Sequence, residues 1–233
     1  MVPYPAGGPS DAIARIFSVP LSKALGQQVI VENLGGVSGA MAAQKVLAAP
    51  PDGHYVFQGS PNEVILSPLA NAAVRLKAED FRLVHPVAEA VMVFVARKDL
   101  EAGNVDELIA LARKSASRPL SYGSVGIGSL YHLILEKVQQ DAGIQLMHVP
   151  YKGQGPAVTD VIGNQVQMLV SSGPSILPMV RNGKLRAIGI TSLKPSPIAP
   201  DLTPMATAIP GYEFDLWWGL LAPAGTPADI VDR

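Results

Sequence analysis

LSYGSVGIGSLYH, residues 120–132, is the stretch around which the chain is organised. Leu120 to Tyr122 predict a short strand, the glycine-rich segment 123–128 predicts a loop, and Ser129 opens a helix. Such a strand-to-helix turn exposes the unpaired backbone N–H groups of a helix N-terminus, where the helix dipole adds positive potential. The hydroxyl groups of Ser124 and Ser129 can donate or accept hydrogen bonds there. The stretch therefore predicts a cradle for an anion.

A similar turn stands at the start of the chain, in MVPYPAGGPSD, residues 1–11. Ser10 or Asp11 is expected to cap the helix that follows, and Gly26 to end it. Pro20 lies inside this pattern and is expected to kink or split the helix. The two glycine turns are thus predicted to be two halves of one binding site.

Strand-like and helix-like segments alternate along the first hundred residues. Strands are expected at 29–31 and 54–59, with a helix at 40–49 between them. This order predicts a parallel sheet with crossover helices. The strand order restarts after about residue 100, so we expect two α/β lobes, which the chain crosses near Glu89–Lys98 and Phe214–Leu221.

The second lobe is expected to repeat the alternation. Its predicted strands are 84–97, 120–122, 145–149, 166–170, 185–191 and 212–222, and its predicted helices are 104–114, 129–141, 156–162 and 176–181. Asn104 is expected to cap the first of these helices.

Ligands of open α/β sheets bind outside the carboxyl ends of the strands. The loops expected at those ends are rich in Gly, Pro, Ser and Asn, which offer backbone amides and hydroxyls. The candidate ligand-binding residues are Tyr4, Ala6, Gly7, Gly8, Ser10, Asp11, Ser60, Asn62, Ser124, Ile127, Gly128, Ser129, His132, Tyr151, Ser171 and Ser172.

Composition excludes several classes of protein. The net charge is −1 and no basic run occurs, which disfavours nucleic-acid or anionic-membrane binding. There are no cysteines, so disulfides and thiolate sites are excluded. No apolar run reaches the roughly 18–20 residues of a membrane span, and no signal peptide is visible.

Motif tests remove most catalytic and cofactor sites. The turn is not G-x-G-x-x-G, because Tyr131 stands three positions after Gly128, so a dinucleotide site is disfavoured. Neither Ser124 nor Ser129 lies in G-x-S-x-G. The four histidines show no metal-binding spacing. We expect no catalytic residue, no metal and no cofactor.

Seven ordered segments resemble the Bug/TctC family, the extracytoplasmic solute receptors of tripartite tricarboxylate transporters. The segments are PYPAGGPSDAIAR, VENLGG, PDGHYVF, LSYGSVGIGSLYHL, HVPYKGQGPAVTDVIGNQVQML, LRAIGIT and WWGLLAPAGTP. They span nearly the whole chain in the expected order.

The resemblance implies a two-lobed periplasmic binding protein of type II. Each lobe is expected to be a mostly parallel sheet flanked by helices, with a two-strand hinge. Lobe 1 would comprise 1–92 plus 219–233, and lobe 2 would comprise 93–218. Relative to the family, the chain starts inside the first strand and stops before the C-terminal segment, so lobe 1 is expected to be truncated at both ends.

The implied function is capture of a small organic carboxylate in the interlobe cleft for membrane transporter subunits. The protein would be a periplasmic monomer without enzymatic activity, nucleic-acid partners or direct membrane insertion. Two alternatives stay open: an α/β enzyme acting on an anionic substrate, and a ligand-sensing subunit for signalling.

Overall fold

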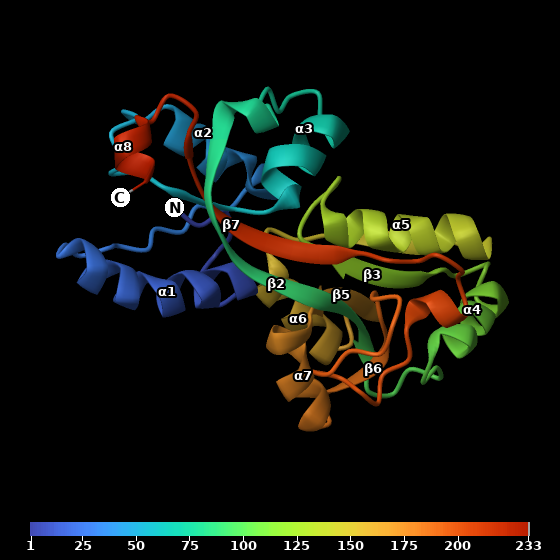
Figure 1. Ribbon diagram of the computed structural model, residues 1–233. Coiled ribbons are helices and arrows are strands. Elements are labelled where there is room, and N and C mark those ends of the chain that lie inside the picture. Colours follow the sequence, from blue (N-terminus) through green and yellow to red (C-terminus); the bar gives the residue numbers. More distant parts are fainter. Residues whose placement is uncertain (233) are drawn as a thin grey trace. The chain divides into compact units, whose positions relative to one another are not determined.

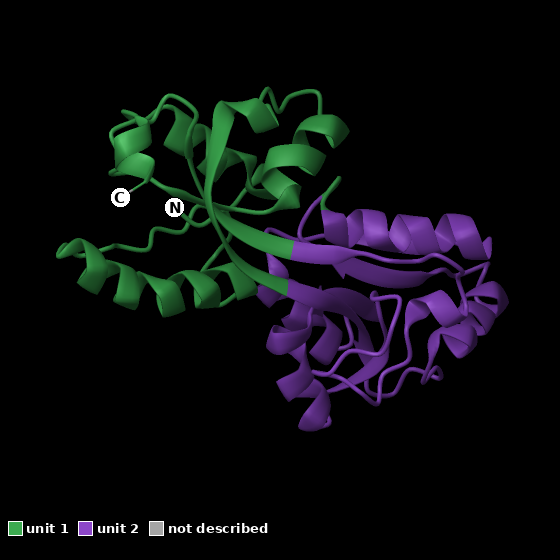
Figure 2. Ribbon diagram, viewed as in Figure 1, with its two compact units in different colours: residues 1–89, 127–129, 217–233 green, residues 90–126, 130–216 purple. Residues whose placement is uncertain are grey.

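The computed structural model describes residues 1–232, which form an α/β fold with one mixed sheet. Two compact units divide the chain, as Figure 2 shows. Unit 1 comprises 1–89, 127–129 and 217–233, and unit 2 comprises 90–126 and 130–216. The long strands β2 (Phe81–Arg97) and β7 (Asp215–Pro223) each carry the chain from one unit into the other.

Unit 1 contains most of the short elements. In chain order these are α1 (Pro9–Leu25), the 3₁₀ turn η1 (Val37–Gly39), α2 (Ala40–Leu47), β1 (Phe57–Gly59), the π turn η2 (Asn62–Leu66), α3 (Ser67–Ala70), the 3₁₀ turn η3 (Ala78–Asp80) and α8 (Ala228–Val231). Its core packs α2 against the rings of Phe57 and Phe81, whose centroids lie 5.5 Å apart.

Helix α1 confirms the predicted stop at Gly26 but corrects the predicted cap and the predicted effect of Pro20. Gly26 ends it in the left-handed conformation, with φ of 65°. The N-cap is Gly8 and no side chain caps the helix, because Asp11 lies one turn inside it. Pro20 does not split the helix: α1 runs continuously through it.

The sheet of unit 1 is less parallel than the alternation predicts. β1 pairs antiparallel with β7, and β7 neighbours β2. In the described residues of unit 1, a parallel bridge joins Val2 to Asn33, and there the Val2 N–H donates to Glu32 O over 2.8 Å. The Gln58 N–H donates to Met1 O over 3.0 Å. The expected strand 29–31 is irregular, since its pairing is reduced to a bridge between Val2 and Asn33.

Unit 2 follows the predicted alternation closely. Its elements are α4 (Val105–Lys114), β3 (Leu120–Ser124), α5 (Leu130–Ala142), β4 (Leu146–Pro150), α6 (Gln154–Ile162), β5 (Met168–Ser172), α7 (Gly173–Arg181), β6 (Leu185–Ile190) and the 3₁₀ turn η4 (Met205–Thr207). β3 runs parallel to β4 and β5, whereas β2 is antiparallel to β5 and β6. The predicted mostly parallel sheet is therefore mixed.

Alternation along the strands of unit 2 separates two apolar layers. Val93 and Val95 of β2 point into the cluster formed with α6 and α7, whereas Phe94 packs its ring against Tyr212. Tyr212 in turn donates its hydroxyl to the Ile134 carbonyl of α5 over 2.6 Å. Helix α5 thus covers the opposite face of this sheet from α6 and α7 (Figure 1).

No helix among residues 1–232 is long and apolar enough to cross a membrane.

Candidate functional site

The carboxyl ends of β3, β4 and β5 meet at one edge of the unit 2 sheet. The parallel register pairs Ser124 with Pro150, the last residues of β3 and β4, and β5 ends beside them at Ser172. Helices α5, α6 and α7 begin just after these three ends. This edge therefore gathers the N–H groups of successive helix N-termini, which favour an anion.

The capping of the helices distinguishes this edge from the opposite one. In the described part of the chain, no side chain caps α6, which follows Gly153, or α7, which follows Ser172. Helix α4 follows the other end of the sheet, where β2 stops at Arg97, and there the Asn104 Oδ1 accepts the Glu107 N–H over 2.9 Å as predicted. Within the described residues of unit 2, a side chain thus caps the helix at the opposite edge, whereas α6 and α7 at the candidate edge have no side-chain cap.

The hydroxyl of Ser124 is buried and engaged with its surroundings. Its Oγ lies 2.6 Å from His148 Nε2 and accepts the Gly126 N–H over 3.1 Å. Sequence analysis selected Ser124 for direct ligand contact; these bonds make it a support of the turn, and its direct contact with a ligand stays a prediction. His148 was not selected; its position in β4, directly beside Tyr122 in β3, is the feature that could have revealed it.

Tyr151 and Ser172 also have partners within unit 2. Tyr151 donates its hydroxyl to Asp160 over 2.6 Å, and burial together with this carboxylate raises the pKa of the tyrosine to about 12. Ser172 donates to the Ser175 hydroxyl over 3.0 Å. Ser171 differs, because its fully buried hydroxyl has no hydrogen-bond partner among the described residues. Such a group costs roughly 1–3 kcal/mol when unpaired.

In unit 1, the turn that leads into α1 and the first residues of this helix carry five of the predicted residues. Ala6 and Gly7 are exposed, whereas Gly8, Ser10 and Asp11 are buried. Asp11 accepts the Gly7 N–H over 3.0 Å and pairs with Arg15 at 3.0 Å. Burial opposes ionisation of Asp11, yet these bonds to Arg15 and Gly7 leave its pKa below the usual value.

Ser10 ties this turn to the strands of unit 1. Its Oγ accepts the Trp218 indole N–H over 3.0 Å, and its carbonyl oxygen accepts from the Gln58 amide over 2.8 Å. The strands β1 and β7 therefore fix where the first amides of α1 lie.

A buried carboxylate, Glu63, joins Tyr4 and Ser60. Glu63 Oε1 accepts the Tyr4 hydroxyl over 2.6 Å, and Oε2 accepts both the N–H and the hydroxyl of Ser60, over 2.6 and 2.8 Å. Burial raises the pKa of Glu63 to about 7, against the opposing effect of these bonds. Asn62, also predicted, is buried beside it.

Sequence analysis missed Glu63, although its spacing from Ser60 was informative. The pattern Ser60-x-x-Glu63 is that of a capping box, in which the acidic side chain returns to the backbone N–H of the first residue. Gly39 makes room for this carboxylate: a Cβ at Gly39 would lie 2.4 Å from Glu63 Cγ.

The glycine-rich loop that joins β3 to α5, residues 123–129, is here called the central turn. Its tip, Ile127 to Ser129, belongs to unit 1 by its contacts. The Ile127 carbonyl oxygen accepts the Ser38 hydroxyl over 3.0 Å. Gly128, with φ of +75°, is packed so closely that an added Cβ would lie 2.2 Å from the Ala70 Cβ. Ser129 is fully buried, whereas the Ile127 side chain is 64% exposed.

The predicted residues thus fall into groups within each unit. Unit 1 holds Tyr4 with Ser60 and Asn62, the α1 turn, and the tip 127–129. In unit 2, the Tyr151 N–H donates to the Ser124 carbonyl oxygen over 2.9 Å, and His148 lies between Ser124 and His132.

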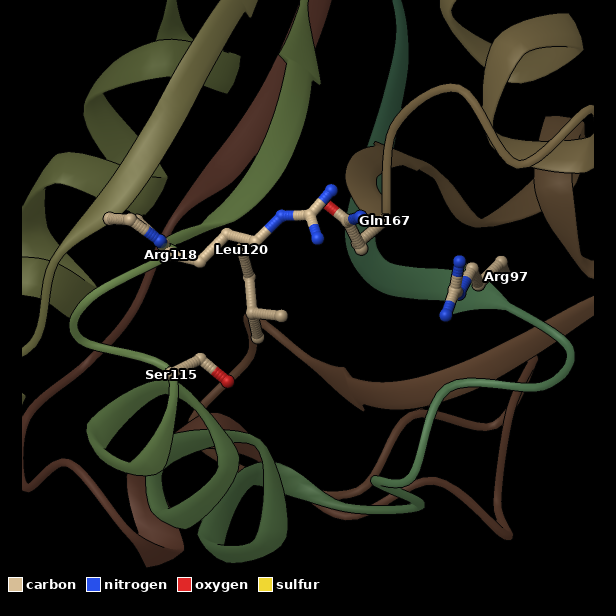
Figure 3. A pocket seen from close by; sticks show the side chains of 6 residues that line it. Arg97, Ser115, Arg118, Leu120 and Gln167 are labelled. Atoms are coloured by element: carbon tan, nitrogen blue, oxygen red, sulfur yellow. The ribbon is translucent and has the colours of Figure 1, made fainter.

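A separate hollow of about 400 Å³ lies in unit 2, at the far ends of the same strands. Arg97, Ser115, Arg118, Leu120 and Gln167 line it with Pro119 (Figure 3). The hollow lies beside Leu120, where β3 begins, whereas the candidate edge lies at Ser124, where β3 ends. None of the predicted site residues lines the hollow. Among the described residues, no group of three or more His, Asp or Glu side chains is arranged to hold a metal ion.

Comparison with known proteins identifies the family to which the chain belongs. A Pseudomonas sp. strain P51 protein of the UPF0065 group is 35% identical over 235 residues, covering all of this chain and 70% of its relative. The periplasmic binding protein BugD superposes with a TM-score of 0.93 at 33% identity, over 99% of this chain and 77% of that one.

Two further solved structures contain ligands. An R. palustris protein with adipate has a TM-score of 0.90 at 32% identity, and MatC from Rhodopseudomonas palustris with bound malate has 0.91 at 28%. Each superposition covers 99% of this chain, together with 78% of the adipate-containing protein and 79% of MatC. The family described as "Tripartite tricarboxylate transporter family receptor" (TctC) matches residues 13–233. The chain therefore belongs to this family of solute-binding receptors, which are binding proteins with the periplasmic binding protein fold and not enzymes.

Proposed function

We propose that this receptor captures a small organic carboxylate through backbone amides at uncapped helix N-termini, some from each unit. The observation that carries the proposal is the capping pattern. α1, α6 and α7 have no side-chain cap in the described residues, whereas α4, at the opposite sheet edge, has one. An uncapped N-terminus leaves N–H donors available for an anion.

Neutral donors suit an anion that must be released again. A buried Arg or Lys would be costly to leave unpaired in the empty receptor, whereas backbone amides carry only partial charge. Ser171 adds support, because its buried hydroxyl is unpaired at the end of β5.

The two relatives that contain malate and adipate suggest the size of the ligand, a dicarboxylate of four to six carbons.

The finer architecture belongs to the same proposal: lobe 1 comprises 1–92 plus 219–233, lobe 2 comprises 93–218, and the strands β2 and β7 act as a hinge between two lobes of the type II class. The candidate site is the set of sixteen residues predicted from the sequence. We further propose that the protein works in the periplasm as a monomer that delivers its ligand to membrane transporter subunits.

The test is calorimetric titration with malate and adipate at pH 7.5, beside dimethyl malate as the uncharged control. Binding of either diacid without binding of the ester is expected, because the ester lacks the charge that the helix N-termini favour. If neither diacid binds and a wider panel of mono- and dicarboxylates also fails, the proposed ligand class is wrong.

A substitution at Gly8 tests the position of the site. Gly8 has φ of −89° and an added Cβ would meet nothing closer than the Pro5 carbonyl oxygen at 3.8 Å, so Gly8→Ala fits the free protein. We expect it to weaken diacid binding at least tenfold by blocking approach to the α1 amides. Gly103→Ala, beside the capped helix α4, is the matched control and is expected to bind normally. Unchanged affinity in Gly8→Ala would remove this turn from the site.

A further inference from the structure

Two histidines of unit 2 are stacked against each other beside the central turn. The rings of His132 in α5 and His148 in β4 have centroids 4.1 Å apart and an angle of 22° between their planes. The ring of Tyr122 in β3 is also stacked with that of His148, and their centroids lie 4.9 Å apart. The parallel register places Tyr122 and His148 side by side on one face of the sheet, and α5 covers that face.

His148 reaches the turn through Ser124. Its Nε2 lies 2.6 Å from Ser124 Oγ, which also accepts the Gly126 N–H over 3.1 Å and lies 3.1 Å from the Gly126 carbonyl oxygen. A hydroxyl has one hydrogen to donate. It can therefore donate either to a His148 nitrogen that carries no proton or to the Gly126 carbonyl.

The surroundings keep His148 uncharged at neutral pH. Burial is the main cause that lowers its pKa to about 4, with a further contribution from the neighbouring His132 and an opposing one from Glu136. Burial also lowers the pKa of His132. The groups facing His148 are Tyr122 and Ser124 from β3, and His132 and Glu136 from α5.

Glu136 is held on the outer side of this cluster. It accepts the Tyr122 hydroxyl over 2.8 Å and lies 3.5 Å from His132 Nε2. Its charge is therefore directed at Tyr122 and His132, and the hydrogen bond of His148 goes to Ser124.

We propose that His148 is a positioning residue of the ligand turn: its neutral ring accepts the Ser124 hydroxyl hydrogen and so fixes the backbone at Gly126, and protonation of the ring reverses this bond and weakens ligand binding. When His148 Nε2 gains a proton, it becomes the donor to Ser124 Oγ. The hydroxyl hydrogen then turns to the Gly126 carbonyl oxygen, and a positive charge forms beside the His132 ring. This inference rests on the proposed function, because it assumes that the turn holds the carboxylate.

The inference predicts a loss of affinity in acid beyond that caused by protonation of the ligand itself. His148→Gln keeps a group able to accept from Ser124 at a similar reach but does not titrate. His148→Phe keeps the stacking ring and removes the hydrogen bond. Both are compared with the wild-type protein, so that titration of the ligand is common to all three.

The experiment measures the malate dissociation constant by calorimetry between pH 4.0 and 7.5. At pH 7.5 we expect His148→Gln within about twofold of wild type and His148→Phe about tenfold weaker, the size of one lost hydrogen bond. At pH 4.0, near the pKa of His148, about half of the rings are protonated, and wild type should have lost about twofold more affinity than His148→Gln. Parallel pH curves for these two proteins, or normal binding by His148→Phe, would overturn the inference.

Ser124→Ala separates positioning from general destabilisation. It should weaken malate binding as His148→Phe does, and the double variant should be no weaker than either single one, since both remove the same bond. Additive losses would contradict the proposal. Failure of the proposed function gives a different result: wild type would bind neither malate nor adipate at any pH.

Discussion

Glu63 shows how a single buried side chain organises unit 1. Its two oxygens hold Tyr4 and Ser60, which lie 59 and 3 residues away along the chain. An ionised carboxylate at this depth is costly, and its hydrogen bonds only partly compensate, so its pKa rises to about 7. The folded protein therefore retains a proton that the unfolded chain loses near pH 4.5.

This retained proton makes stability depend on pH. Because the folded pKa of Glu63 is raised, its contribution is fully present below about pH 4.5 and is lost as the pH rises through about 7. Glu63→Gln copies the protonated form, with an oxygen for Ser60 and an N–H₂ for Tyr4. Urea unfolding at pH 5 and 8 should show the variant gaining stability relative to wild type at pH 8. Tyr4→Phe keeps the carboxyl group of Glu63, so its free energy of unfolding should change with pH as that of wild type does. An equal change with pH in wild type and Glu63→Gln would refute the assignment.

At the scale of elements, the turn between β3 and α5 is fixed by close packing as well as by hydrogen bonds. Gly128 has φ of +75° and lies against Ala70 at the end of α3. Glycine serves here for two reasons, since the backbone conformation disfavours other residues and the neighbouring methyl group leaves no space. The glycine-rich turn is thus a packing element in addition to a candidate anion cradle.

The packing reason can be separated from the conformational one. Gly128→Ala is expected to destabilise the protein by about 2 kcal/mol or more, through positive-φ strain plus overpacking. Ala70→Gly removes the clashing methyl group, so the double variant should recover the overpacking part and keep the strain. Urea unfolding of the four proteins gives the coupling energy. A double variant that recovers nothing would show that Ala70 is not the obstacle.

At the scale of the whole molecule, the proposed function assigns ligand-binding amides to both units, and this has a distinctive consequence. A ligand held by amides of both units must protect both from opening. At a free concentration of one hundred times its dissociation constant, a ligand stabilises the folded state by about 2.7 kcal/mol.

Hydrogen exchange with and without saturating malate measures where this protection falls. We expect slower exchange in the first turn of α1 and in the first turns of α6 and α7, with the N-terminus of α4 unchanged as the internal control. Protection confined to unit 2 would place the ligand on one unit alone and contradict the two-unit site.

The agreement between sequence and structure is closest where local patterns suffice. The stop of α1 at Gly26, the Asn104 cap of α4 and the strand–helix alternation of unit 2 follow from capping residues and apolar periodicity within a few positions. The predicted parallel sheet of unit 1 was too simple. Its main pairing, β1 with β7, joins residues more than 150 positions apart and is antiparallel.

The resemblance of seven segments identified the family, and the sequence by itself also determined the α/β class and the glycine turns, because glycine, proline and capping residues act on their immediate neighbours. Tertiary structure alone decided which side chains support those turns. Glu63 beneath Tyr4 and His148 beside Ser124 depend on the register of strands distant in sequence, and a contact set by register leaves no local pattern strong enough to identify both partners. The central turn in LSYGSVGIGSLYH is therefore recognisable from its glycines, but its geometry is fixed by Ala70, Ser38 and His148, which lie elsewhere in the chain.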